Sequence, residues 1–168
     1  PVIAFKRKAL YRAFENARRR DDPGLRAQQE SFEAQNRDWL DDFALFMALK
    51  LRFDWAVWTD WERAIALREP EALAYWREEL RDEIAFQRCT QFWFDKQWSA
   101  LKRYANGHGV QIVGDMPIFM GHDSSEVWSR RELFQLDENG RPRVVAGVPP
   151  DYFSATGQLW GNPHYCWD

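Results

Sequence analysis

One stretch of the chain, residues 110–120, breaks the helical pattern that precedes it and limits what the chain can fold into. Its sequence, VQIVGDMPIFM, is almost continuously apolar and rich in β-branched residues, which is typical of a parallel strand covered on both faces. Pro117 cannot donate to a ladder, so we expect regular pairing over about residues 110–116. A single strand of this kind leaves its edges unpaired unless other strands flank it.

The residues before this stretch predict helices. Apolar side chains recur at helical spacing over about residues 4–20, 25–35 and 38–51. Pro70 suits the first turn of a further helix that runs to about Tyr104, a length that leaves room for a kink or for a second helix inside it. We expect a packed helical part.

Three tryptophans follow one another at intervals of three between these helices. Trp55, Trp58 and Trp61 fit a core stripe, which we expect in preference to an exposed ligand surface. Aromatic residues make up 16% of the chain, enough for both core packing and a ligand-binding surface.

Short elements are expected after residue 120. Asp123 with Glu126 three positions later resembles a capping box and predicts the start of a short helix. Asn139-Gly140 between apolar segments predicts a β-hairpin over about residues 133–146. Residues 147–165 show no period and predict a long ordered loop or a run of turns. The expected organisation is a helical subdomain of residues 1–70 followed by an α/β segment of residues 71–168.

Charge and motif content argue against several functions. A net charge of −3 gives no reason to expect a nucleic-acid partner, and the basic runs at residues 6–8 and 18–20 fit solvated helix faces. No apolar run is long enough to span a membrane and no signal-peptide pattern occurs at residues 1–10, so we expect no membrane partner and a cytoplasmic location. The histidines lack metal-ligand spacing and no nucleotide-binding loop occurs, so neither a metal nor a cofactor is expected. Cys89 and Cys166 are expected to be free thiols.

Asp115 stands near the carboxyl end of the predicted strand. A carboxylate in an apolar strand must be paired or hydrogen-bonded. Two readings stay open at this point: a structural hydrogen bond to a neighbouring loop, or an active-site carboxylate at the functional edge of an α/β fold.

Residues 148–163 combine a stiff backbone with exposed chemistry. Paired prolines and several glycines alternate with aromatic rings and with carboxylate and amide side chains. Sugars present apolar faces ringed by hydroxyl groups, which flat rings and planar polar groups bind well. The residues concerned are Asp151, Tyr152, Phe153, Gln158 and Trp160. A plain packed loop is the alternative.

These motifs resemble the amylomaltase family of 4-α-glucanotransferases. The resemblance rests on GDMPIF at residues 114–119, HDS at 122–124, VVAGVPPDYFS at 144–154 and GQLWGNP at 157–163. It is continuous from about Phe92 to Asp168, whereas the helical first half is less diagnostic. Cys166 departs from the polar residue expected at its position.

The resemblance implies an interior piece of a (β/α)8 barrel with helical insertions, since 168 residues are too few for a barrel of about 250. It implies transfer of α-1,4-glucan segments between maltooligosaccharides by a retaining mechanism without cofactor. Asp115 matches a substrate-site aspartate on the third barrel strand. Asp151, Tyr152 and Phe153 match the tip of a loop over the cleft, and Gln158 and Trp160 match sugar contacts.

The family's nucleophilic aspartate stands in an Arg-x-Asp-His context, which does not occur in this sequence. The resemblance therefore implies that the nucleophile and the acid/base lie downstream, and that these 168 residues alone do not turn over substrate. Two alternatives remain open: a stand-alone carbohydrate-binding or helical interaction module, and a hydrolase of the α-amylase clan. The sequence does not decide the oligomeric state.

Overall fold

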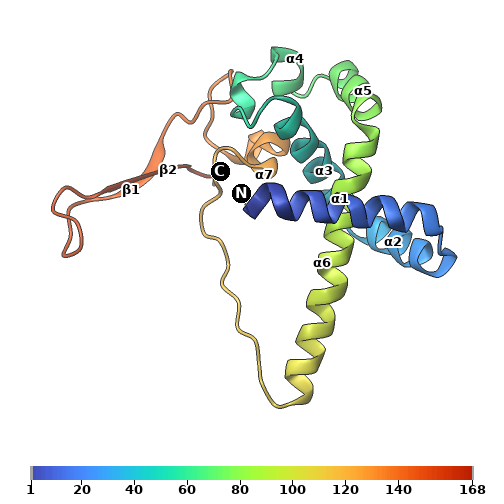
Figure 1. Cartoon of the computed structure of the whole chain (residues 1–168). Coiled ribbons are helices and arrows are strands. Elements are labelled where there is room, and N and C mark those ends of the chain that lie inside the picture. The colour runs from blue at the N-terminus through green and yellow to red at the C-terminus, as the bar shows by residue number, and fades with distance from the viewer. Residues whose placement is uncertain (1, 168) are drawn as a thin grey trace. The chain divides into compact units, whose positions relative to one another are not determined.

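The structure, a computed structural model, describes residues 2–167 and is mostly helical (Figure 1). The helices, 3-10 turns (η) and strands are α1 (Val2–Arg20), α2 (Pro23–Gln35), α3 (Arg37–Arg52), η1 (Trp58–Asp60), α4 (Arg63–Ala66), α5 (Pro70–Glu79), α6 (Arg81–Gly107), α7 (Ser125–Ser129), η2 (Arg131–Leu133), β1 (Val145–Val148) and β2 (Gln158–Pro163). The chain divides into two compact units. The first runs up to Leu45 and from Leu80 to Gly114, and the second holds residues 46–79 and everything from Asp115 onward.

Helices α1, α2 and α3 confirm the three helical stretches expected from apolar spacing. The break between α1 and α2 has a local cause, because Asp22 caps α2. Its Oδ1 accepts hydrogen bonds from the backbone N–H groups of Gly24 at 2.8 Å and Leu25 at 3.2 Å, and Pro23 occupies the first turn. The expected long helix from Pro70 is two helices, α5 and α6, which meet at Leu80.

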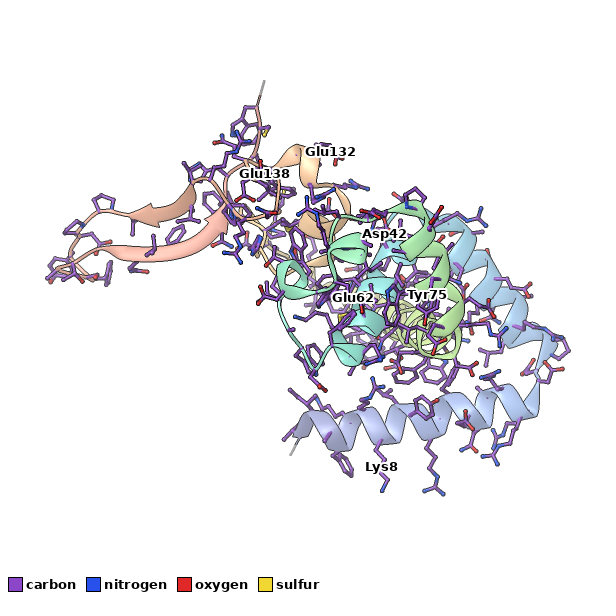
Figure 2. All side chains as sticks on the ribbon, turned by 90° about the horizontal axis from the view of Figure 1, so that it is seen from above. Lys8, Asp42, Glu62, Tyr75, Glu132 and Glu138 are labelled. Carbon is purple, nitrogen blue, oxygen red and sulfur yellow. The ribbon has the colours of Figure 1, made fainter. Side chains whose placement is uncertain are left out.

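The core of the first unit lies where α1 and α2 pack against α6. Phe14 clusters with Phe86 and Cys89, and Phe32 clusters with Leu40 and Phe92. Trp93 packs against both clusters. Most of the basic residues of α1 stay exposed as expected, and Lys8 points away from the neighbouring helices (Figure 2).

The core of the second unit is aromatic. Trp58 and Trp128 are fully buried, and Trp61 is 5% exposed. The expected tryptophan stripe is therefore confirmed for Trp58 and Trp61. Trp55 is 55% exposed, because α3 ends before it and the backbone at Asp54 and Trp55 turns through the left-handed region, with φ of 49° and 64°.

The predicted strand at residues 110–116 has no partner strand in the described part of the chain. This segment is extended but unpaired, as Figure 1 shows, and its side chains are exposed, Val113 by 92%. A parallel strand draws its hydrogen bonds from strands on either side, and the strands in the described part of the chain, β1 and β2, pair with each other. The segment has the composition of a buried strand, but the described part of the chain contains no neighbouring strand that hydrogen-bonds to it.

The structure corrects the prediction for residues 133–165. The Asn139-Gly140 turn is confirmed, with Gly140 at φ 79°, but the pairing described beside it is an isolated bridge between Leu136 and Pro142. The extended pairing lies further on, where β1 and β2 form an antiparallel ribbon with Gly147 opposite Leu159. Part of the expected loop is therefore a strand, because pairing with β1 stabilises residues that show no period of their own.

Two smaller points concern local chemistry. The N-cap of α7 is Ser124, whose Oγ accepts from the Val127 backbone N–H at 3.3 Å, so the expectation of an Asp123 cap is wrong. Asp123 is instead bound to Lys50.

The prediction of free thiols is confirmed, with Cys89 buried and Cys166 exposed.

Candidate functional site

The loop at the end of the β1–β2 ribbon, residues 149–157, is held by its own hydrogen bonds. Asp151 Oδ1 accepts from the backbone N–H groups of Phe153 at 2.9 Å and Ser154 at 2.8 Å. The Asp151 N–H in turn donates to the Ser154 carbonyl at 2.9 Å. This side chain therefore fixes the turn that presents its neighbours, as Asp does in Asx-turns.

The loop closes tightly onto the first strand at Gly157. Its φ of 74° lies in the left-handed region, and a Cβ at this position would lie 2.5 Å from the Val148 carbonyl oxygen. Ser154 Oγ donates to the Gly157 carbonyl at 2.7 Å. Only glycine fits this approach, which explains a glycine at the end of an otherwise bulky loop.

Tyr152 and Phe153 are the most exposed aromatic pair of the ribbon. Their side chains are 98% and 89% exposed, and their rings meet edge to face with centroids 5.7 Å apart. Large exposed apolar patches are typical of interaction sites. The chemistry of these two rings suits the apolar face of a sugar ring or an apolar partner surface.

Trp160 and Gln158 lie two residues apart on β2, so their side chains share one face of the strand. The Trp160 indole Nε1 donates to Gln158 Oε1 at 3.1 Å. This bond fixes the amide orientation and leaves the amide nitrogen as a donor. Trp160 also packs edge-on against Phe119, at 6.0 Å between centroids. The pair forms a ring with an adjacent polar group, 49% of the indole remaining exposed.

Asp115 is exposed, and its described contact is local. Its Oδ1 accepts from the backbone N–H of Met116 at 2.8 Å. The segment that follows does reach the ribbon, because Phe119 packs on Trp160 and Asn162 Nδ2 donates to the Met120 carbonyl at 2.9 Å. The structure thus joins residues 119–120 to β2, while no described contact links Asp115 itself to Tyr152 or Phe153.

Lys50 was not singled out by the sequence analysis and is the most deeply buried cation of the second unit, at 3% exposed. Its ammonium donates to the carbonyls of Trp55 at 2.9 Å and Ala56 at 2.7 Å and pairs with Asp123 Oδ2 at 2.5 Å. The signal that could have found it is a single lysine inside the apolar run LFMALKL, because a charge placed there must have partners.

Two of the three histidines, His108 and His122, hydrogen-bond through their rings to backbone carbonyls. His122 Nε2 donates to the Gly140 carbonyl at 2.8 Å, and His108 Nδ1 to the Tyr104 carbonyl at 2.8 Å. Within residues 2–167, no group of three His, Cys, Asp or Glu side chains could hold a metal ion. None of the helices described for this chain has the length and apolar character needed to cross a membrane.

Comparison with known proteins covers the whole chain. The sequence model of a family described as 4-alpha-glucanotransferase matches residues 1–168. The 4-alpha-glucanotransferase of Thermus thermophilus is 48% identical over 167 residues, which is 99% of this chain and 33% of that protein. The corresponding protein of Synechocystis sp. is 46% identical over 168 residues, again 99% and 33%.

A solved structure shares the fold. The amylomaltase from Streptococcus agalactiae in complex with acarbose superposes with a TM-score of 0.91 at 45% identity, covering 98% of this chain and 33% of that one. This chain therefore spans about a third of the length of these relatives. The similarity extends over the helical first half as well as the motif-rich second half.

Proposed function

The chain belongs to the 4-alpha-glucanotransferase family, and from that premise we propose that the protein containing it transfers α-1,4-glucan segments between maltooligosaccharides. One observation of the structure carries the proposal. The ribbon presents Tyr152 and Phe153 almost fully to solvent on a turn locked by Asp151. Such rigid, exposed rings suit the stacking of sugar units.

Glucan transfer by retention needs two carboxyl groups. One forms a glycosyl-enzyme, and the other serves first as acid and then as base. The proposal assigns neither role to these 168 residues, because the Arg-x-Asp-His context of the nucleophile does not occur among them. Asp115 is assigned to substrate binding, where a carboxylate accepts hydrogen bonds from sugar hydroxyl groups.

The extended segment of residues 110–116 has a role in the same proposal. Its β-branched residues are exposed and its backbone is unpaired in the described chain. We assign it to a strand of a (β/α)8 barrel whose remaining strands come from the rest of the protein. Asp115 then stands near the carboxyl end of that strand, where barrel enzymes place their functional residues.

The ribbon explains why transfer would prevail over hydrolysis. Water and an acceptor sugar compete for the glycosyl-enzyme. Rings that cover the cleft exclude water and orient the acceptor hydroxyl group, effects worth roughly several kcal/mol. Tyr152 and Phe153 supply the cover, and Gln158 beside Trp160 supplies a fixed polar contact.

The test replaces Tyr152 and Phe153 together by Ala in the full-length protein, with maltotriose as substrate. Transfer releases glucose without changing the total number of reducing ends, whereas hydrolysis adds one reducing end for each bond broken. We expect the ratio of transfer to hydrolysis to fall about tenfold. Leu159→Ala is the matched control, because Leu159 is an exposed apolar residue of the same ribbon, 80% exposed. An unchanged ratio in the double variant would remove the assigned role of the rings.

A second measurement tests the assignment of the catalytic groups. We expect the 168-residue chain to release no glucose from maltotriose and the full-length protein to release it. Activity of the short chain would show that its own carboxylates perform catalysis. A rise in reducing ends with wild-type protein, equal to the bonds broken, would favour a hydrolase instead.

A further inference from the structure

Lys50 lies in the last turns of α3 with its charge in the protein interior. Its side chain is 4% exposed, against 36% for its partner Asp123. The ammonium has three hydrogen atoms and three acceptors, namely the Trp55 and Ala56 carbonyls and Asp123 Oδ2. Every donor of this buried cation is therefore used.

On one side Lys50 holds a turn that is unfavourable by itself. Asp54 and Trp55 both have left-handed backbone conformations, with φ of 49° and 64°, which crowd the Cβ of residues other than glycine. The Trp55 N–H donates to the Lys50 carbonyl at 2.7 Å. Lys50 thus closes this turn with both its main chain and its side chain.

On the other side Lys50 holds the segment of residues 120–123. Trp58 Nε1 donates to the His122 carbonyl at 2.8 Å, next to the Asp123 that Lys50 binds. At the other end of the same segment the Met120 carbonyl accepts from Asn162 Nδ2 of β2 at 2.9 Å. One short segment therefore connects Lys50 to the base of the ribbon.

Stability alone does not account for a charge in this place. The desolvation of a buried ion pair offsets most of its attraction, and replacing both partners together by apolar residues of similar volume is often as stable, whereas removing one partner alone is destabilising. A methionine at position 50 would take the ammonium away from Asp123 and from the Trp55 and Ala56 carbonyls. What a methionine could not do is fix the direction of three acceptors at once, and this directional role is the property that distinguishes lysine here.

We propose that Lys50 is a positioning residue for the ribbon: through Asp123 and residues 120–122 it sets the place of β2, and so of Gln158, Trp160 and the aromatic loop. The consequence for glucan transfer rests on the proposed function. The consequence for the ribbon itself does not, since it follows from the hydrogen bonds alone.

The test uses Lys50→Met in the full-length protein. The matched control is Arg88→Met, which removes a half-buried cation bound to Asp41 at 2.8 Å and near Glu33 at 3.8 Å in the other unit, without a described link to the ribbon. Amide hydrogen exchange over residues 158–162 is the first readout. We expect about tenfold faster exchange there in Lys50→Met and no change in Arg88→Met, because Lys50 is linked to this strand through residues 120–123 and Arg88 has no described link to it.

The kinetic measurements use maltotriose as substrate. They determine KM and kcat separately, and the ratio of transfer to hydrolysis. We expect Lys50→Met to lower the ratio of transfer to hydrolysis about tenfold, since misplacing a binding group by about an ångström has effects of this order or larger. Asp123→Asn keeps an acceptor oxygen for Lys50, and we expect it to retain more of the transfer ratio than Asp123→Ala. A uniform loss of folded protein would lower the apparent kcat and leave this ratio unchanged.

The outcomes separate the two proposals. Unchanged exchange of β2 in both Lys50→Met and Asp123→Ala overturns the positioning role. Faster exchange in a protein that transfers no glucan supports the positioning role and removes the proposed function. If Lys50→Met does not fold, Asp123→Ala carries the same comparison, because it removes the link from the partly exposed side.

Discussion

Two aromatic clusters within one unit of the chain have opposite environments. Phe46, Trp61 and Trp128 meet with ring centroids 5.5 to 5.9 Å apart and are at most 5% exposed. Tyr152 and Phe153 meet at 5.7 Å and are 98% and 89% exposed. The distances between ring centroids are similar in both clusters, so ring spacing by itself does not distinguish a core from a binding surface.

The difference lies in what surrounds the rings. Short helical elements and their loops enclose the first cluster, and the Trp128 indole Nε1 donates to the Ile65 carbonyl at 3.2 Å. The guanidinium of Arg68 covers the Trp128 face at 4.3 Å from the ring centre. A two-stranded ribbon cannot enclose side chains in this way. Aromatic residues on such a ribbon are therefore available for binding, whereas those of the first cluster stabilise the fold.

The largest effect is expected at the centre of the buried cluster. Trp128→Ala in the full-length protein should lower the free energy of unfolding by about 4 kcal/mol, because it leaves a large cavity and removes the hydrogen bond from the indole to the Ile65 carbonyl. Denaturant unfolding measures the change. The control is Trp167→Ala, at a residue 85% exposed, where we expect less than about 1 kcal/mol. Equal losses in the two variants would contradict the division into core and surface.

A smaller loss is expected where a turn touches the same core. Gly140 has φ 79°, and a Cβ there would overlap the Trp58 ring. Gly140→Ala combines backbone strain with overpacking and should cost roughly 3 kcal/mol. The same measurement applies, with Gly121→Ala as control, because nothing lies within 4 Å of a Cβ at Gly121. Stability equal to wild type would mean that the turn moves away from Trp58 without cost.

The two cysteines extend the comparison of buried and exposed groups to pH. Burial, with a smaller contribution from the charge of Glu33, raises the pKa of Cys89 from 9.0 to about 12. The folded state keeps the thiol proton at a pH where the unfolded state has lost it, so stability falls as pH rises above 9. At pH 10 the loss from this group is on the order of 1 kcal/mol.

The dependence of stability on pH is measured as the difference in unfolding free energy between pH 8 and pH 10, in wild type and in Cys89→Ala. The variant should lose less stability over this interval, by on the order of 1 kcal/mol, whatever its stability at pH 8. Cys166→Ala, at the exposed cysteine, should keep the wild-type slope. A slope in Cys89→Ala as steep as in wild type would show that the Cys89 thiol is not shielded from water.

The smallest effect on stability is expected at the exposed rings. Tyr152→Ala with Phe153→Ala should change the free energy of unfolding by less than about 0.5 kcal/mol, because the rings are already in water. Denaturant unfolding of the double variant checks this. A loss as large as that of Trp128→Ala would show that the rings are part of a packed core, and their assignment to binding would fail.

The helices could be read from the sequence because their information is local. Apolar spacing placed α1, α2 and α3, and Asp22 with Pro23 marked the start of α2. The break at Leu80 could not be placed, since its backbone turns out of the helix without a side-chain cap. The residues of the ribbon tip were also identified from the sequence, because rings, a carboxylate and stiffening prolines are all visible there.

Pairing and burial required the tertiary structure. Residues 110–116 have the composition of a strand, yet a strand forms only where neighbours complete its ladder. Residues 158–163 show no period and become β2 because β1 lies beside them. The apolar spacing of α3 does not indicate what binds the charge of Lys50, since one of its three acceptors, Asp123, lies 73 residues further along the chain. Sequence alone determined where the chain coils and which chemical groups it carries; contacts between distant residues decided which of those groups are covered, paired or left free to bind.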